Sequence, residues 1–157
     1  MCSSDLRLVY MPDSTRRTSN PRFAGDGKLV GFADGYAYLV TTQASLAELN
    51  RRLAAKGARE VPMNRFRPNF VVSGGNAFDE DHWGRIRIGE ATLRAVKPCG
   101  RCQVTTTDQT TGEVTGPEPL ATLTAFRDSE LGARFGMNLV TERGGAVRVG
   151  DAVEVLD

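Results

Sequence analysis

Short β-prone runs separated by glycine-containing turns dominate this chain of 157 residues. Apolar and polar side chains alternate in residues 85–88 and 91–95, which predicts strands with one buried face. Further β-prone runs lie at residues 6–10, 29–32, 36–41, 70–72, 137–140, 147–149 and 153–155. Short strands at hairpin spacing with few helices are typical of closed sheets. The sequence therefore predicts a mainly β fold with short helices (α+β), arranged as a closed or nearly closed β-barrel.

Two helices are expected among these strands, one after residue 42 and one over residues 117–127. Ser45 and Glu48 fit a capping box, with Thr42 as the other candidate cap, and Gly57 would end the first helix. Apolar side chains spaced by helical turns should face the core at Leu46, Leu49, Leu53, Leu120, Leu123 and Phe126. These stripes indicate core packing.

Composition restricts the class of protein. Hydrophobic residues make up 40% and charged residues 25%, which is typical of a globular domain, and we expect one domain over residues 1–157 with a loose terminus at 1–5. A net charge of +1 gives no reason to expect a nucleic-acid or membrane partner. Three cysteines are too few for a disulfide framework, and we find neither a long apolar run nor a signal peptide. These features predict a reducing compartment, the cytoplasm.

Residues 97–108, KPCGRCQVTTTD, carry most of the candidate chemistry. Cys102 follows Arg101, whose permanent charge should favour the thiolate, the form of cysteine that binds metals or attacks substrates. The β-prone residues 103–107 suggest that this cysteine loop runs into a strand.

The pair Cys99 and Cys102 has three other interpretations. A redox pair of the thioredoxin type would begin a helix, which the β-prone residues 103–107 do not favour. A structural zinc ion would need four ligands, and only Cys2 and His82 remain to complete them. The two cysteines could also be partly buried thiols that behave as small hydrophobic residues.

Several motifs that follow one another along the chain help to decide between these interpretations of the two cysteines. They are NRFRPNFVV at 64–72, DEDHW at 79–83, RIG at 87–89, KPCGRC at 97–102, TTTD at 105–108 and PEPL at 117–120. Together they resemble the MOSC domain family, and more narrowly its branch of mitochondrial amidoxime-reducing components and their bacterial counterparts. The resemblance extends from Asp5 to Leu156 and implies a MOSC-type barrel that holds a molybdenum cofactor (molybdopterin).

The resemblance also implies roles for individual residues of the cysteine segment. The second cysteine of the pair, Cys102, would be the metal ligand and a catalytic residue. Gly100 and Arg101 would lie against the cofactor, where a glycine lets the backbone approach closely. Asp108 is the other candidate catalytic residue, either orienting the threonines and steering substrate or only stabilising a turn.

Residues outside this segment complete the expected site. Arg67 and Asn69 would bind the phosphate or the pterin edge, since an arginine fork matches such groups. The residues alone favour a surface salt bridge for Arg67 and a strand-end cap for Asn69. Gly35 and Tyr36 align with a turn that contacts the cofactor through its backbone. Arg16 and Arg17, in a polar loop, could reach an anionic ligand, but a solvated basic loop is favoured.

The implied activity is the reductive removal of oxygen from small N-hydroxylated compounds, with electrons from a donor protein of the flavin, iron–sulfur or haem type. Two alternatives stay open: a carrier or interaction module for a metal–sulfur group without turnover, and a remnant β-barrel without cofactor. The family also has an association with pyridoxal phosphate binding. Relatives carry an additional N-terminal β domain, and the chain is expected to begin about where that domain ends.

Overall fold

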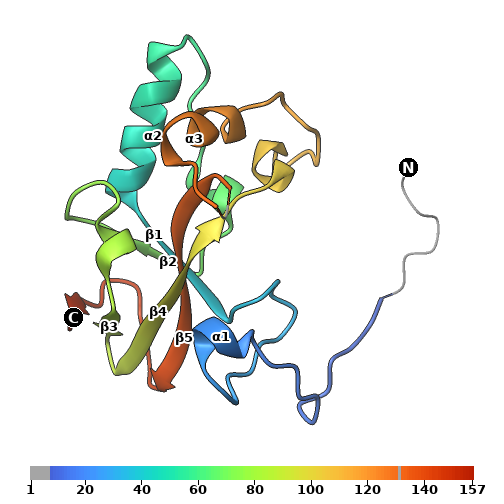
Figure 1. The fold of residues 1–157 in the computed structure, drawn as a ribbon, viewed down its shortest axis with the longest axis vertical. Coiled ribbons are helices and arrows are strands. Elements are labelled where there is room, and N and C mark those ends of the chain that lie inside the picture. The colour runs from blue at the N-terminus through green and yellow to red at the C-terminus, as the bar shows by residue number, and fades with distance from the viewer. Residues whose placement is uncertain (1–7, 131) are drawn as a thin grey trace.

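The computed structural model describes residues 8–130 and 132–157, and in them six strands form one mixed sheet, ordered β2-β1-β5-β4-β3-β6 (Figure 1). The strands are β1 (Tyr38–Thr42), β2 (Phe70–Val72), β3 (Arg85–Ile88), β4 (Ala91–Gly100), β5 (Arg134–Arg143) and β6 (Val153–Val155). The helices are α1 (Pro21–Ala24), α2 (Gln43–Ala55) and α3 (Leu120–Arg127), with 3-10 helices η1 (Met63–Phe66), η2 (Asp79–His82) and η3 (Gln103–Thr106). The sheet curls into a nearly closed barrel, which confirms the predicted fold class.

The hairpin of β3 and β4 forms as the alternation predicts. Ile86 pairs with Leu93 across the two strands, and both side chains are buried, whereas Arg85 and Arg87 face outward. β4 then pairs along its length with β5, with register shifts that bend both strands. This long pair carries the chain towards the cysteines.

The helix α2 begins directly after β1. Thr42 Oγ1 accepts the amide of Ser45 at 3.1 Å, so Thr42 is the cap. The predicted capping box is wrong, because the Ser45 hydroxyl donates to Glu80 at 2.8 Å and Glu48 pairs with Arg51 and Arg52 instead. Gly57, with φ of +72°, follows the end of the helix as expected.

Two apolar clusters make up the core. One lies between the helices and the first residues of β5, and the other lies among the strands of the barrel. The helix-side cluster buries Leu49, Leu53, Val61, Phe66, Leu123, Ala133 and Phe135. The barrel cluster buries Val40, Ile86, Ile88, Leu93, Met137 and Leu139. In Figure 1, α2 and α3 lie together at one end of the barrel.

Three of the β-prone runs outside the cysteine segment are absent from the described sheet. Leu8, Val9 and Tyr10 are exposed and outside any strand, while residues 6 and 7 lie outside the described part. Residues 29–32 contribute only a single bridge, from Leu29 to Thr18. Residues 147–149 form a loop instead, because the amide of Arg148 donates to Asp151.

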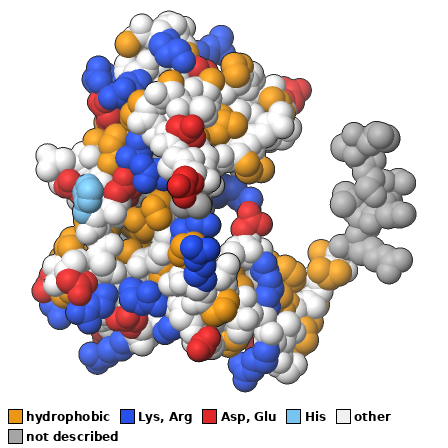
Figure 2. All heavy atoms as spheres, viewed as in Figure 1, with side chains coloured by type: hydrophobic (Ala, Val, Ile, Leu, Met, Phe, Trp, Pro, Cys, Tyr) orange, Lys and Arg blue, Asp and Glu red, His pale blue; other side chains and the backbone are white. Residues whose placement is uncertain are grey.

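β2 is an edge strand and is less buried than expected. Its Val71 side chain is 47% exposed, while Phe70 and Val72 pack against the barrel cluster. The surface carries mixed charge: Lys, Arg, Asp and Glu side chains alternate over the face in Figure 2. Among the residues that the structure describes, no helix is long and apolar enough to cross a membrane.

Candidate functional site

The cysteine segment leaves the sheet at the end of β4. Cys99 still belongs to β4, whereas Cys102 is exposed and caps η3. The strand predicted over residues 103–107 is wrong. The hydroxyls of Thr105 and Thr106 donate to the carbonyls of Cys102 and Gln103 at 2.9 and 2.7 Å, which favours a 3-10 turn over an extended chain.

The two thiols have different surroundings. Cys99 is partly buried, and burial raises its thiol pKa, although the charge of Arg101 and a hydrogen bond with Asn138 both act to lower it. Cys102 is exposed. The structure therefore presents Cys102 as the sulfur that a ligand can reach.

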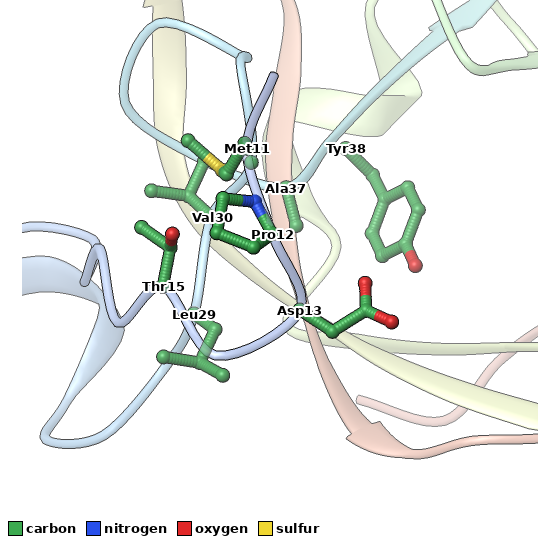
Figure 3. A pocket seen from close by; sticks show the side chains of 9 residues that line it. Met11, Pro12, Asp13, Thr15, Leu29, Val30, Ala37 and Tyr38 are labelled. Carbon is green, nitrogen blue, oxygen red and sulfur yellow. The ribbon is translucent and has the colours of Figure 1, made fainter.

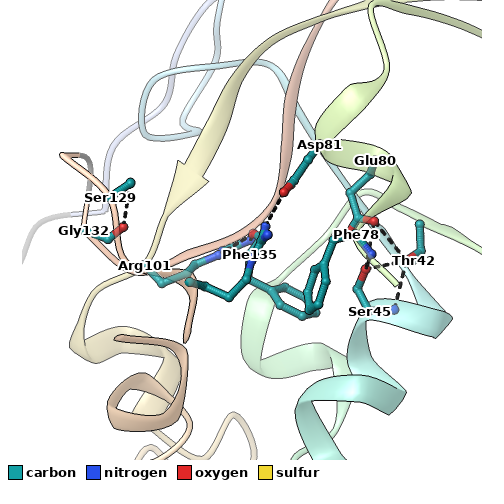
Figure 4. A network of polar contacts seen from close by, with 10 residues as sticks. Thr42, Ser45, Phe78, Glu80, Asp81, Arg101, Ser129, Gly132 and Phe135 are labelled. Atoms are coloured by element: carbon teal, nitrogen blue, oxygen red, sulfur yellow. Dashed lines mark hydrogen bonds and ion pairs between the residues drawn. The ribbon is translucent and has the colours of Figure 1, made fainter. Parts of the chain in front are cut away.

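The Arg101 side chain turns inward, away from solvent (Figure 4). Its Nε and Nη2 donate to the carbonyl oxygen of Phe135 at 2.8 and 2.6 Å, and its Nη1 donates to that of Phe66 at 3.1 Å. The guanidinium carbon also lies 5.4 Å from the centre of the Phe66 ring. The side chain thus joins the cysteine segment to η1 and to β5.

Arg67 follows η1 in a left-handed conformation, with φ of 53° and ψ of 47°. Such a backbone is unfavourable for residues with a side chain, and Pro68 comes directly after it. The Arg67 side chain is exposed and forms no ion pair or hydrogen bond within the described chain, so the surface salt bridge considered from the sequence does not form there.

Asn69 has a structural task. Its side-chain Oδ1 accepts a hydrogen bond from the backbone amide of Leu39. Its backbone amide donates to the Leu39 carbonyl, and both distances are 2.9 Å. This is the strand-end role that the residue type suggested. Asn69 and Arg67 are both exposed residues.

Gly35 and Tyr36 lie in the bend that leads into β1. Arg17 holds this bend, since its guanidinium donates to the carbonyls of Gly31, Ala33 and Asp34 at 2.6, 2.6 and 2.7 Å. Burial is the main cause of the raised pKa of the Cys99 thiol, and the negative charge of Asp34 adds to it. No sequence signal separated Arg17 from its neighbour Arg16.

Asp108 is tied to its own loop. Its Oδ1 accepts the amides of Thr110 and Thr111 at 2.8 and 3.2 Å, and these bonds lower the pKa of the carboxyl. Its Oδ2 lies 3.3 Å from Nη2 of Arg65, a buried side chain of η1 that also donates to Thr115. These contacts favour the turn-stabilising interpretation, and the catalytic role of Asp108 stays a prediction.

A cavity of about 380 Å³ opens beside the bend before β1 (Figure 3). Asp13 and the Tyr38 hydroxyl face one another across it, and Tyr38 packs on Phe70 with ring centres 5.5 Å apart. The other lining residues are Met11, Pro12, Thr15, Leu29, Val30, Gly31 and Ala37. This hollow lies on the Gly31 and Ala37 flank of the bend.

The segments of Arg67 and Cys102 lie against each other. η1 contacts η3, which Cys102 directly precedes, and Arg101 bonds to the residue that precedes Arg67. Around this point the chain offers one exposed thiol and a surplus of guanidinium groups.

This fold and arrangement of residues are those of a known domain family. The family described as the MOSC domain matches residues 27–154, which is most of the chain. The protein belongs to the MOSC domain family, as the ordered motifs indicated.

The chain is similar to mitochondrial amidoxime-reducing components. It is 38% identical to component 1 from Homo sapiens over 135 residues, which are 81% of this chain and 39% of the relative. It is 36% identical to component 2 from Bos taurus over 159 residues and 39% identical to component 2 from Rattus norvegicus over 160 residues, each covering 94% of this chain and 46% of the relative. The chain thus spans less than half the length of these relatives.

Proposed function

We propose that this MOSC domain binds the molybdenum cofactor through Cys102 and takes part in the reductive removal of oxygen from N-hydroxylated compounds. The observation that carries the proposal is the exposed Cys102 thiol on a segment that Arg101 bonds to the turn of Arg67. The relatives are named as amidoxime-reducing proteins, and an amidoxime is an N-hydroxylated amidine, which supports the substrate class.

The donor set fits a cofactor that brings most of its own metal ligands. Among the described residues no group of three or more His, Cys, Asp or Glu side chains could hold a metal ion. A single soft thiolate is a suitable protein ligand for a metal that already carries sulfur donors. Cys102 would fill that role, while the partly buried Cys99 would not.

The charges near the thiol suit an anionic, phosphate-bearing ligand. Four arginines lie on the segments that meet there: Arg65, Arg67, Arg101 and Arg134. Of these four, only Arg65 forms an ion pair within the described chain, with Asp108. Nε of Arg65 and Nε of Arg134 are buried without a hydrogen-bond partner in the part of the chain that the structure describes. Unpaired guanidinium groups favour phosphate as a partner.

The chain's own residues would then act as follows. Cys102 would hold the metal, Arg67 and the free amide nitrogen of Asn69 would bind the phosphate or the pterin edge, and the backbone at Gly35, Tyr36 and Gly100 would line the remaining side. The Arg101 guanidinium is already bonded to two carbonyls, so its cofactor contact would come from the backbone.

When bound, the cofactor would supply a redox centre for oxygen transfer. In the net reaction the N–O bond of the substrate breaks, the oxygen leaves as water, and two electrons and two protons are consumed. The electrons would come from a donor protein with a flavin, iron–sulfur or haem group. Free thiols at Cys99 and Cys102 support the cytoplasmic location that the cysteine content predicts. A role for pyridoxal phosphate stays a prediction of the resemblance.

Elemental analysis tests the proposal. The 157-residue chain is produced in a bacterial host that makes the cofactor, and molybdenum and pterin fluorescence are measured per chain. We expect molybdenum in the wild type and in Cys99→Ala, and a loss of about tenfold or more in Cys102→Ala. A wild type without molybdenum, or equal molybdenum in Cys102→Ala, would contradict the proposal.

Turnover separates the enzyme from the alternatives. Benzamidoxime and a reduced donor protein are added to the molybdenum-loaded chain, and amidine formation is measured. Formation of amidine that depends on Cys102 supports the reductase, while loading without turnover favours the carrier. Absence of both molybdenum and turnover favours the remnant barrel.

A further inference from the structure

We propose that Arg101 is a positioning residue that fixes the place of the Cys102 thiol relative to the Arg67 turn. Its guanidinium holds two carbonyl oxygens from segments that are far apart in the sequence, those of Phe66 and Phe135. This inference deepens the proposed function and depends on it only for the molybdenum measurement described below.

The contacts of Arg101 account for most of its donors. Three N–H groups reach the two carbonyls at 2.6 to 3.1 Å, and the side chain packs on the Phe66 ring. The planar fork of a guanidinium can bond two acceptors at fixed directions, whereas the ammonium of a lysine is a point charge on a flexible stem. A carbonyl buried without such a donor would lose a hydrogen bond that water cannot replace.

The two carbonyls belong to the points where the backbone turns. Phe66 directly precedes Arg67, which has φ of 53°, and Phe135 directly precedes Gly136, which has φ of 78°. Phe66 is the last residue of η1, and Phe135 lies in β5 at the register shift between its pairings with Pro98 and Gly100. The Phe66 and Phe135 rings also stack with centres 4.0 Å apart, which places the two backbones side by side.

The position of Arg101 in the chain gives these bonds their consequence. Cys102 is the next residue after Arg101, and Arg67 is the next residue after Phe66. The amide of Arg101 donates to the Ala133 carbonyl at 2.7 Å, so the backbone of this segment is also held to the residue that precedes β5. One half-buried side chain therefore fixes both proposed ligand residues against the same frame.

The charge of Arg101 has no carboxylate partner in the described chain. The guanidinium would therefore attract an anionic ligand at the thiol by its charge, while its hydrogen bonds set the geometry.

Amide hydrogen exchange tests positioning directly and needs no cofactor. Arg101→Met keeps the length and apolar character of the stem but removes the fork. We expect the amides of Arg67, Asn69 and Arg101 to exchange about tenfold faster or more in this variant, after correction for the global stability measured on core amides of β1 and β5. Equal exchange at these amides, relative to the core, would overturn the proposal.

Arg94→Met is the matched control. Arg94 also donates to two backbone carbonyls, those of Phe23 and Ala24 at 3.4 and 2.5 Å, but these belong to α1. Its loss should speed exchange near α1 and leave the Arg67 and Asn69 amides unchanged relative to the core. If Arg94→Met altered those amides as much as Arg101→Met, the effect would be general destabilisation and the proposal would be wrong.

Molybdenum content gives the second readout. We expect Arg101→Met to retain about tenfold less molybdenum than the wild type while its Cys102 thiol still reacts with a maleimide. Arg101→Lys should restore little of the loss, and full restoration would contradict the bridging role. If the wild type holds no molybdenum, the proposed function fails, but the exchange result still decides the positioning role.

Discussion

The carbonyl oxygen of Val40 lies where a side chain on Gly136 would have to begin. A Cβ built on Gly136 would be 2.6 Å from this oxygen and 2.7 Å from Cγ2 of Thr41. Gly136 also has φ of +78°. The bend at this glycine lets Phe135 face the helix-side cluster while Met137 faces the barrel cluster, although residues two apart in a regular strand share a face.

Replacement of Gly136 by alanine should therefore be severely destabilising. The left-handed backbone and the overlap with backbone atoms of β1 both oppose a Cβ, and we expect a loss of about 3 kcal/mol or more in the free energy of unfolding. Urea denaturation measures it. Gly57→Ala is the control, because Gly57 has φ of +72° with open space around it and should cost only about 1 kcal/mol. Equal losses would show that β1 does not restrict this position.

Asp81 and Arg127 form a buried ion pair with Oδ2 and Nη2 2.5 Å apart and side chains 12% and 11% exposed. Removing one partner leaves the other charge buried, so Asp81→Asn or Arg127→Met should each cost about 3 kcal/mol. The double variant should be closer to the wild type than the sum of the two losses. A double-mutant cycle by urea denaturation checks this, and additive losses would contradict direct pairing. The exposed Arg51→Ala should cost less than about 1 kcal/mol.

Glu80 should make stability depend on pH. Its carboxyl is fully buried against Thr42 and Ser45 (Figure 4), and burial raises its pKa. A carboxyl with a raised folded pKa stabilises the fold fully below its unfolded pKa, and this contribution is lost as pH rises through the folded value. Glu80→Gln should therefore gain stability relative to the wild type as pH rises from 4 towards 8.

Glu48 should make stability depend on pH in the opposite direction to Glu80. Hydrogen bonds from Arg51 and Arg52 lower its pKa to about 2. Its stabilising contribution is present above the unfolded pKa and is lost as pH falls through about 2. Thermal unfolding is measured from about pH 2 to 8. As pH rises, the stability relative to the wild type should increase for Glu80→Gln and decrease for Glu48→Gln. A wild type and Glu80→Gln with parallel pH profiles would show that Glu80 titrates normally.

The two described thiols should differ in reactivity. Cys99 is partly buried with a raised pKa, so at neutral pH less of it is thiolate than in an ordinary cysteine. In a Cys2→Ser background, iodoacetamide should modify Cys102 faster than Cys99, and the Cys99 rate should keep rising with pH beyond the ordinary thiol range. Peptide mass spectrometry measures both rates. Faster modification of Cys99 at neutral pH would contradict the structure.

Local patterns account for the parts of the fold that were predicted. Alternation at Ile86 and Ile88 identified the β3–β4 hairpin, and the apolar stripe at Leu49 and Leu53 identified α2, because each pattern reflects one buried face. Predictions failed where polar side chains formed hydrogen bonds that the apolar pattern does not reveal, whether with distant or with nearby residues. Ser45 bonds to Glu80 rather than acting in a capping box, and the threonines of η3 bond backwards along their own chain.

The candidate site shows the same division. The motifs named Arg67 and Cys102 as site residues, which stays a prediction, and the structure shows that the Cys102 thiol is exposed. Arg65 was missed, and Arg17 was expected to be solvated or to reach an anionic ligand, because nothing in a single sequence distinguishes an arginine that bonds within the fold from one in solvent. Arg101 was expected to act on its neighbouring cysteine, and its guanidinium instead joins Phe66 to Phe135.

The sequence by itself determined the alternating faces of the hairpin, the helix stripes and the family to which the ordered motifs belong, since these depend on residues close together in the chain. Only the tertiary structure decided that Arg101 lies between η1 and β5, and that Gly136 must admit the backbone of β1. Those relationships join residues tens of positions apart, and they exist only when the chain has closed and brought two unpaired carbonyls within reach of one buried cation.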